Sequence, residues 1–200
     1  MKTGTIVLGV LLFLIALLGM NGCSTRNALV NKEEDVKSKW HQVENQYQRR
    51  NDLIPNIVSV VKNYADFEKS TLIGVVEARA KATAVTVDAS KLDAASMQKF
   101  QQAQQGVSAS LGKLLVVAEQ YPQLKANESF MNLQVQLEGC ENRIATARKD
   151  FNDVVQDYNV AIRVFPANVW AGMFGFQKKD FFEAEAGADK APDVNKLFKK

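Results

Sequence analysis

Apolar residues recur every three or four positions over more than thirty residues in the C-terminal half of the chain. This spacing is typical of one amphipathic helix with a narrow, coiled-coil-like stripe, and no strand pattern produces it. The stripe consists of Phe130, Leu133, Leu137, Cys140, Ile144, Ala147, Phe151, Val154, Tyr158, Ala161 and Phe165. A helix of this extent is about 50 Å long and must bury its stripe against other elements. The pattern therefore predicts a helical bundle.

A second stripe of the same period lies in the N-terminal half. Its members are Val36, Trp40, Val43, Tyr47, Arg50, Ile54, Ile57, Val61 and Tyr64. Asn31 and Glu34 form a pair like a capping box, which predicts that the helix begins at Asn31. Pro55 removes a backbone donor inside it. Because the stripe keeps its phase across Pro55, we expect one helix kinked there rather than two separate helices.

Two more helices are predicted between these stripes. Asp66 can cap the first, from Phe67 to about Ala84, and Ser90 with Asp93 can open the other. The second of the two has the stripe Met97, Phe100, Gln104, Val107, Leu111, Leu114, Ala118 and Tyr121. Pro122 ends it, and Asn127 can cap the long helix, which runs to Pro166. Short connections make neighbouring helices antiparallel. The expected fold is all-α, an antiparallel bundle of about four long helices.

The N-terminal segment differs from the bundle in composition. Residues 6–20 are almost wholly apolar, and no charge follows Lys2 until Arg26. With its uncharged flanks the segment reaches about the 20 residues of a membrane span. Met20–Ser24 also resembles a bacterial lipobox, in which Cys23 would be acylated after cleavage. A single-span anchor and a lipoprotein signal both remain open, and both place the chain at a membrane.

The organisation then divides into three parts. Residues 1–26 form the transmembrane anchor or lipoprotein signal, 27–166 the bundle, and 167–200 an aromatic strap with a polar tail. Basic residues after the anchor favour a cytoplasmic body. The lipobox-like Cys23 favours export, and long domains cross largely regardless of flanking charge. We expect an extracytoplasmic body.

Charge and residue types narrow the function classes. The 25 basic and 22 acidic residues are mixed along the chain, without the basic stripe of a nucleic-acid-binding protein. His41 is the only histidine, and no metal-ligand spacing surrounds it. No phosphate-binding loop, nucleophile elbow or HExxH motif is present. Cys140 lies on a buried stripe, where a thiol is a poor nucleophile. We therefore expect no catalytic residue, no metal and no cofactor.

Arg50 is the unusual member of its stripe, because a guanidinium among apolar residues needs a carboxylate or a route to water. One interpretation is a structural ion pair near Pro55, with Glu77 or Glu141. The other is a polar pocket that binds an anion or a peptide terminus. The pocket would comprise Arg50, Asp52, Glu77, Arg79, Glu141 and Arg143.

The stretch 165–176 is apolar, aromatic and punctuated by glycine, without a helical stripe. It can fold back as a strap that caps one end of the bundle. Alternatively, Trp170, Phe174 and Phe176 contact a partner or a membrane interface, since Trp and Phe favour both settings.

Several segments together resemble the LemA family. They are Arg49–Val58, Val61–Ala65, Phe67–Lys69, Glu77–Ala80, Leu133–Gln134, Leu137–Glu138, Glu141–Ile144, Ala147–Arg148, Tyr158–Asn159, Phe165–Pro166, Phe174–Phe176 and Phe182–Ala184. The resemblance covers about Asn27 to Pro192. It implies a bacterial, membrane-anchored bundle of long helices with no established enzyme activity. It also implies an uncleaved N-terminal span, from which the Gly22–Cys23–Ser24 junction departs.

These observations favour a non-enzymatic, membrane-anchored adaptor or scaffold for other proteins of the cell envelope. The alternative is a binder of a small anionic ligand or peptide in the polar pocket around Arg50. An enzyme has the least support, and nucleic acid is not an expected partner.

Overall fold

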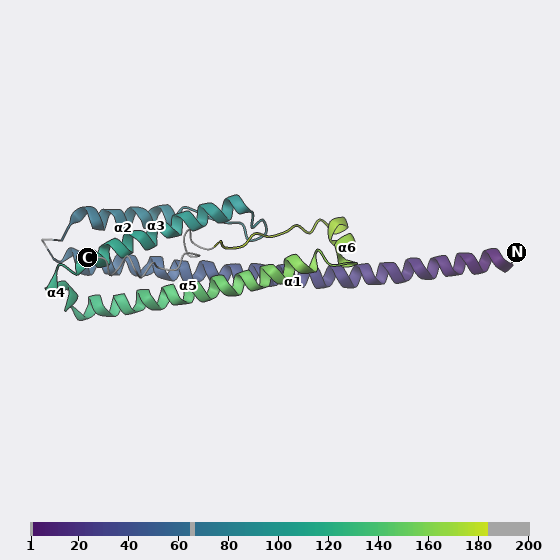
Figure 1. Ribbon diagram of the computed structural model, residues 1–200, viewed down its shortest axis with the longest axis horizontal. Helices are drawn as coiled ribbons and strands as arrows, with labels where there is room; N and C mark the ends of the chain where they lie inside the picture. The colour runs from purple at the N-terminus through teal and green to yellow at the C-terminus, as the bar shows by residue number, and fades with distance from the viewer. Residues whose placement is uncertain (1, 65–66, 184–200) are drawn as a thin grey trace, which may run out of the picture.

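The protein is an elongated bundle of antiparallel helices, from which one helix projects (Figure 1). The computed structural model describes residues 2–64 and 67–183, except the side chains of residues 2, 3, 5, 6, 10 and 14–18. The helices are α1 (Lys2–Lys62), α2 (Lys69–Thr83), α3 (Ala94–Ala118), α4 (Pro122–Lys125), α5 (Glu128–Ala161) and α6 (Ala167–Phe174). The all-α, antiparallel prediction is confirmed.

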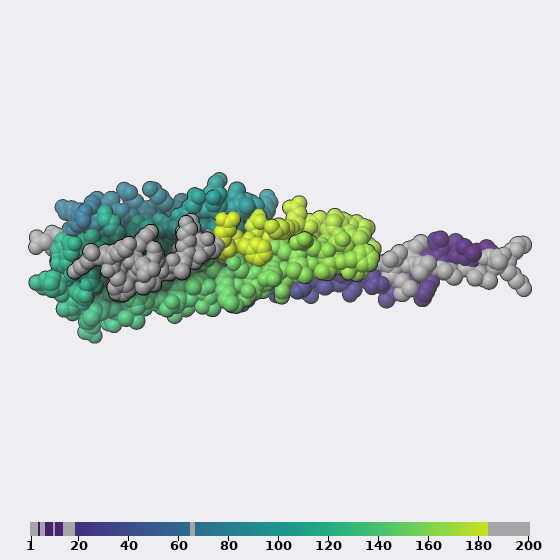
Figure 2. Space-filling model, viewed as in Figure 1, coloured from purple at the N-terminus to yellow at the C-terminus, as the bar shows by residue number. Residues whose placement is uncertain are grey.

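Two antiparallel pairs make up the bundle. Helix α1 packs along α5, and α2 packs along α3. The short helix α4 closes one end and contacts both α3 and α5, as Figure 1 shows on the left. Helix α6 packs on α1 toward the other end, beyond which the N-terminal part of α1 projects (Figures 1 and 2).

The predicted start of the first helix at Asn31 is wrong. Helix α1 is one helix of 61 residues, about 90 Å long, and Asn31 lies in its interior. A capping residue is needed only where a helix begins. No proline lies between the apolar segment and Asn31, and Gly22 alone costs too little to stop a helix already formed. The expected boundary at 26/27 therefore lies within one helix.

Helix α1 also continues through Pro55, as expected. A proline at this position cannot donate to the carbonyl of Asn51, four residues before it. Arg79 of α2 takes over, because its Nε donates to that carbonyl at 2.9 Å. The proline is thus accommodated by a side chain from the neighbouring helix.

The three other predicted helix starts have different outcomes. Helix α3 begins at Ala94 rather than Ser90, and Asp93 is its cap, accepting from the Ser96 N–H at 2.9 Å. Asn127 caps α5 as predicted, accepting from the Phe130 N–H at 3.0 Å. Asp66, the expected cap of α2, is outside the described residues.

Helix α5 ends at Ala161, not at Pro166, and its stripe shifts before that end. Val155 is buried where Val154 was predicted. A straight helix drifts about 20° per heptad against a strict seven-residue repeat, so after about four heptads the buried face moves by nearly one residue. Phe165 is 83% exposed, because Pro166 disfavours helix at the residue before it. The predicted strap in turn contains a helix, α6, before its extended part.

The buried residues form two clusters along α1 and α5. The distal core contains Ile54, Ile57, Val61, Phe67, Val75, Ala82, Val107, Leu111, Leu114, Ala118, Leu124, Phe130, Leu133 and Leu137. The strap-side core contains Val36, Trp40, Val43, Tyr47, Val87, Leu92, Met97, Phe100, Ile144, Ala147, Phe151, Val155, Tyr158 and Phe182. Phe182 belongs to the extended segment 176–183, called the strap below, which lies against α5 (Figure 2).

Candidate functional site

Arg50 is fully buried between α1, α3 and α5, with 1% of its surface exposed. Its Nη1 donates to Glu141 Oε1 at 2.9 Å and to Ser108 Oγ at 2.8 Å. Its Nη2 donates to Gln104, at 2.8 Å from Oε1 and 3.2 Å from the carbonyl oxygen. The guanidinium also lies 5.1 Å from the ring centroid of Tyr47. Of the two predicted ion-pair partners, Glu141 makes the pair.

This arrangement bonds both terminal nitrogens of the guanidinium to groups of the protein itself, while its Nε is buried without a hydrogen-bond partner among the described residues. The cavity beside it has a volume of about 40 Å³, which suits one or two water molecules rather than a ligand. Glu141 is half-exposed at its outer side, so the pair is open to water at one edge. The geometry favours a structural role, in which one side chain of α1 fixes the register of α3 and α5.

The other residues of the predicted pocket lie apart from Arg50. Arg79 is bonded to the Asn51 carbonyl, and Arg143 Nη2 lies 3.8 Å from Cys140 Sγ. Asp52 lines a different, wider groove with Tyr47 and Phe100. Glu77 lies at the rim of an apolar groove on α1 and α2. The structure therefore pairs Arg50 with Glu141 and does not gather the six into one pocket.

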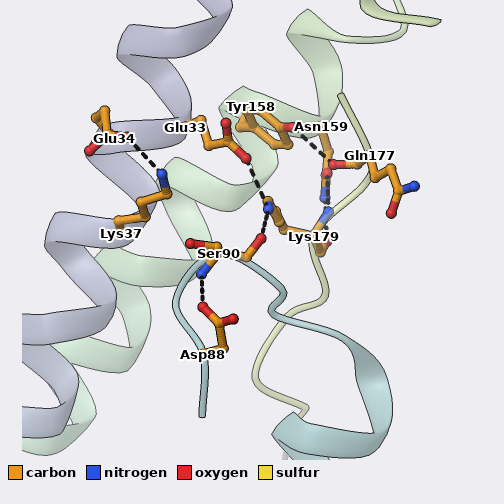
Figure 3. A network of polar contacts seen from close by, with 9 residues as sticks. All are labelled: Glu33, Glu34, Lys37, Asp88, Ser90, Tyr158, Asn159, Gln177 and Lys179. Carbon is orange, nitrogen blue, oxygen red and sulfur yellow. Dashed lines mark hydrogen bonds and ion pairs between the residues drawn. The ribbon is translucent and has the colours of Figure 1, made fainter. Parts of the chain in front are cut away.

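A second polar network was missed by sequence reasoning, and it holds the strap (Figure 3). Asn159 Nδ2 donates to the Lys179 carbonyl at 2.8 Å, and the Lys179 N–H donates back to Asn159 Oδ1 at 3.0 Å. Asn152 makes the same pair of bonds with Phe182, at 3.1 and 2.9 Å. The available signal was two asparagines seven residues apart beside the stripe of a long helix.

Lys179 is buried in the same network, with 5% of its surface exposed. Its Nζ lies 3.0 Å from Glu33 Oε1 of α1 and also donates to the Ser90 carbonyl (Figure 3). Tyr158 Oη donates to the Gln177 carbonyl at 2.9 Å. Burial, with the nearby Glu33 charge, raises the pKa of Tyr158 to about 12. These contacts tie α1, α5 and the loop before α3 to the strap.

The aromatic residues predicted to make contacts divide between two settings. Trp170 and Phe174 of α6 stack on each other, with ring centroids 6.1 Å apart. Trp170 lies against Gly22 of α1, where a Cβ would come within 3.0 Å of its ring. Arg26 lies 5.8 Å from the centroid of Phe174. Phe176 packs instead against the strap-side core.

The remaining candidates can also be placed. Cys23 is exposed on α1, and Cys140 is buried on α5. His41 is exposed, with Nδ1 2.9 Å from Glu44 Oε2. Within the described ranges, no group of three or more His, Cys, Asp or Glu side chains could hold a metal ion. Among these residues, no helix is long and apolar enough to cross a membrane. The side chains of residues 14–18, inside the expected anchor, are not among the described ones.

Comparison with known proteins gives relatives over nearly the whole chain. Magnetosome protein MamQ 2 of Paramagnetospirillum magneticum is 28% identical over 213 residues, covering 96% of this chain and 75% of the relative. Magnetosome protein MamQ of Magnetospirillum gryphiswaldense is 28% identical, covering 82% of this chain and 66% of the relative. Protein LemA of Metamycoplasma hominis is 21% identical, covering 80% of this chain and 69% of the relative.

The family comparison agrees with these relatives. The LemA family model matches residues 39–195, which include most of α1 within the bundle, all of α2–α6 and the strap. The Arg50 pair and both strap asparagines fall inside the matched region. The chain belongs to the LemA family.

Proposed function

We propose that the protein is a membrane-anchored, non-enzymatic adaptor, whose bundle holds other envelope proteins at a fixed distance from an extracytoplasmic membrane surface. The observation that carries this proposal is the continuity of α1. One uninterrupted helix contains the apolar segment 6–20 and then forms a wall of the bundle. Such a helix transmits the orientation of the anchor to the bundle without a flexible joint.

The position of α6 supports the attachment to a membrane. Helix α6 packs on α1 at Gly22, directly after the apolar segment ends. Val169 and Met173, four residues apart on one side of α6, are 58% and 66% exposed, and Phe165, two residues before the helix, is 83% exposed. An apolar stripe with aromatic neighbours suits the boundary between headgroups and acyl chains. On this proposal the stripe rests on the lipid surface beside the anchor.

The opposite end of the molecule offers a face for a partner. An apolar groove of about 350 Å³ is lined by residues of α1 and α2 that include Val58, Leu72, Ile73 and Val76. Ile73 and Val76 are 56% and 50% exposed. By the helical rise, Val58 lies about 57 Å along α1 from Met20. Exposed apolar patches of this kind mark protein contacts, so the proposed partner is an envelope protein with an apolar helix or segment.

A photocrosslinking residue placed at Ile73 tests the adaptor role in native membranes. We expect a discrete crosslinked product that contains one membrane or envelope protein. The matched control is the same residue at Gln136, which is exposed on α5. A product that is equally strong from both positions, or absent from both, would overturn the adaptor proposal.

Attachment is tested separately from partner binding. Removal of residues 1–26 should move the protein from the membrane to the soluble fraction. Metabolic labelling with a clickable fatty acid, in the wild type and in Cys23→Ala, distinguishes the two modes: label that depends on Cys23 identifies a lipoprotein, and no label identifies a span. Retention of the truncated protein in washed membranes would contradict an N-terminal anchor.

A further inference from the structure

The strap is held as a peptide ligand is held by a receptor, rather than as a strand or a helix of the bundle. Each of two asparagine side chains on α5 bonds both the N–H and the C=O of one strap residue. A residue of a β-strand makes the same pair of hydrogen bonds, through its N–H and its C=O, with the residue opposite it on a neighbouring antiparallel strand. The amide groups of Asn152 and Asn159 thus replace a strand.

The spacing of the two asparagines matches an extended chain. Seven residues along a helix rise about 10.5 Å, and three residues of extended chain span about 10 Å. The bonds therefore fall on Lys179 and Phe182, three residues apart, from side chains on one face of α5. Because these bonds reach only backbone atoms, they are independent of the peptide's sequence.

Selectivity for the peptide sequence comes from the side chains of the two strap residues whose backbones the asparagines bond. Phe182 is 4% exposed and stacks on Trp40, with centroids 5.7 Å apart and an interplanar angle of 18°. Arg148 covers the same ring, 5.0 Å from its centroid. Lys179 reaches Glu33 and the Ser90 carbonyl in a second pocket. Asp180 and Phe181, between them, are only partly buried. The groove is therefore built for an extended Lys-x-x-Phe segment.

We propose that this groove is an exchangeable peptide-binding site, and that the strap of a second copy of this chain occupies it in place of the molecule's own strap. The strap is the segment whose chemistry fits the groove at every contact described above. It is joined to α6 through Gly175, whose φ of 78° places it in the left-handed region. Rotation at this glycine can redirect the strap without unfolding a helix. Exchange goes beyond the adaptor role and does not depend on it.

The site is tested with a fluorescein-labelled peptide of residues 176–183 and the full-length protein in detergent. The molecule's own strap competes at a millimolar effective concentration, so the wild type should bind the peptide weakly. Phe182→Ala weakens that competitor and should raise the apparent affinity for the peptide at least tenfold. Adding Asn152→Ala and Asn159→Ala should abolish the gain. The same peptide with alanine in place of both Lys179 and Phe182 is the matched control.

The proposal can be overturned whether or not the Phe182→Ala protein folds. If Phe182→Ala keeps the helical circular dichroism of the wild type and binds no peptide, the groove is not exchangeable and the proposal is wrong. If that variant loses its helical signal, the wild type is titrated to millimolar peptide instead. Absence of saturable binding there, beyond that of the Asn152→Ala/Asn159→Ala protein, likewise overturns the proposal.

The second copy is tested by complementation between two differently tagged full-length proteins. One carries Phe182→Ala, with an intact groove and a defective strap. The other carries Asn152→Ala/Asn159→Ala, with an intact strap and a defective groove. We expect the mixed pair to co-purify at least tenfold more than either variant with itself. Peptide binding without such complementation would overturn the second copy as occupant and assign the groove to another protein with a Lys-x-x-Phe segment.

Discussion

The two cores of the bundle share the same pair of long helices and are closed in different ways. Around the distal core, α2 and α3 complete four helical walls, and α4 covers the end. Around the strap-side core, α2 has ended at Thr83 and α3 begins only at Ala94. The loop between them and the strap fill the missing walls. The bundle thus has four helical walls around the distal core, whereas the walls of the strap-side core are α1, α5, the first turns of α3, and two irregular segments.

The difference shows what a non-helical wall requires. A helix satisfies its own backbone, whereas an extended segment against a core needs external partners. The strap obtains most of them from side chains of α5, and others from outside it: the Asp180 N–H donates to the Leu92 carbonyl of the loop before α3, and Gln101 of α3 donates to the Glu183 carbonyl. The partners on α5 are Asn152, Asn159, Tyr158 and Arg148. It also contributes the ring of Phe182, which meets Trp40, Phe100 and Phe151. The strap-side core therefore depends on polar groups and large rings, and the distal core on aliphatic packing between helices.

The largest contrast is expected from truncating one central residue of each core. Trp40→Ala should lower the free energy of unfolding by about 3–5 kcal/mol, and Leu114→Ala by about 2–4 kcal/mol. Both are fully buried. Only Trp40→Ala should also release the strap, because the indole is the surface on which Phe182 stacks. Urea denaturation measures the first effect and hydrogen exchange at residues 179–182 the second. Equal loss of protection in the two variants would refute independent closure of the cores.

Arg50 lies between the two cores, and its replacement separates packing from polar pairing. Arg50→Ala removes the stem and leaves buried Gln104 without its partner, so we expect a loss of about 2–4 kcal/mol. Arg50→Met keeps most of the stem volume but leaves Gln104 and Glu141 unpaired, as Arg50→Ala does, and removing one partner of a buried ion pair is itself destabilising. The methionine variant should therefore lose less than Arg50→Ala in urea denaturation, by the part that the stem contributes. Equal losses would show that the polar bonds, not the stem, hold the register.

The asparagines of α5 should affect only the strap side. Asn159→Ala leaves the buried N–H and C=O of Lys179 without partners, which costs about 1–3 kcal/mol. Asn142→Ala, at an exposed position of the same helix, is the matched control and should change stability by less than about 0.5 kcal/mol. Hydrogen exchange should locate the loss in residues 177–183. If the distal core loses protection to the same extent, the strap is not a separate unit.

Sequence reasoning succeeded where period alone decides the structure. Every member of the α3 stripe from Met97 to Ala118 is buried, as its spacing predicted. Arg50 is paired with one of the two carboxylates that were expected as its partner. Sequence reasoning was wrong where the structure of a residue depends on what precedes it in the chain. Asn31 resembles a cap but lies inside a helix that began earlier, and the one-residue shift to Val155 follows from accumulated helical drift.

The strap network could not be derived from spacing. Asn152 and Asn159 look like ordinary polar residues of an amphipathic helix until the strap returns beside them. Lys179 carries no local sign that it will be buried, because Glu33 and Ser90, its partners, are far away in sequence. The six residues of the predicted polar pocket do not gather around Arg50 for a related reason: Pro55 cannot donate to the Asn51 carbonyl, and Arg79 bonds that carbonyl instead. Contacts between segments that are distant in sequence depend on the topology of the fold, and the spacing of apolar residues gives no information about topology.

The smallest expected effect is a dependence on alkaline pH that belongs to the strap side. Tyr158 is fully buried, and its folded pKa of about 12 lies above its ordinary value of 10.0. Because the folded state holds the proton more tightly, its contribution is full below pH 10 and is lost as pH rises through 12. At pH 11 the loss is about 1 kcal/mol. The measurement is urea denaturation of the wild type and Tyr158→Phe from pH 9 to 11. Lysines titrate over the same range in both proteins, so the steeper fall of the wild type isolates the phenol. Parallel curves would show that the hydroxyl ionises with a nearly ordinary pKa, and that water reaches the strap at Gln177.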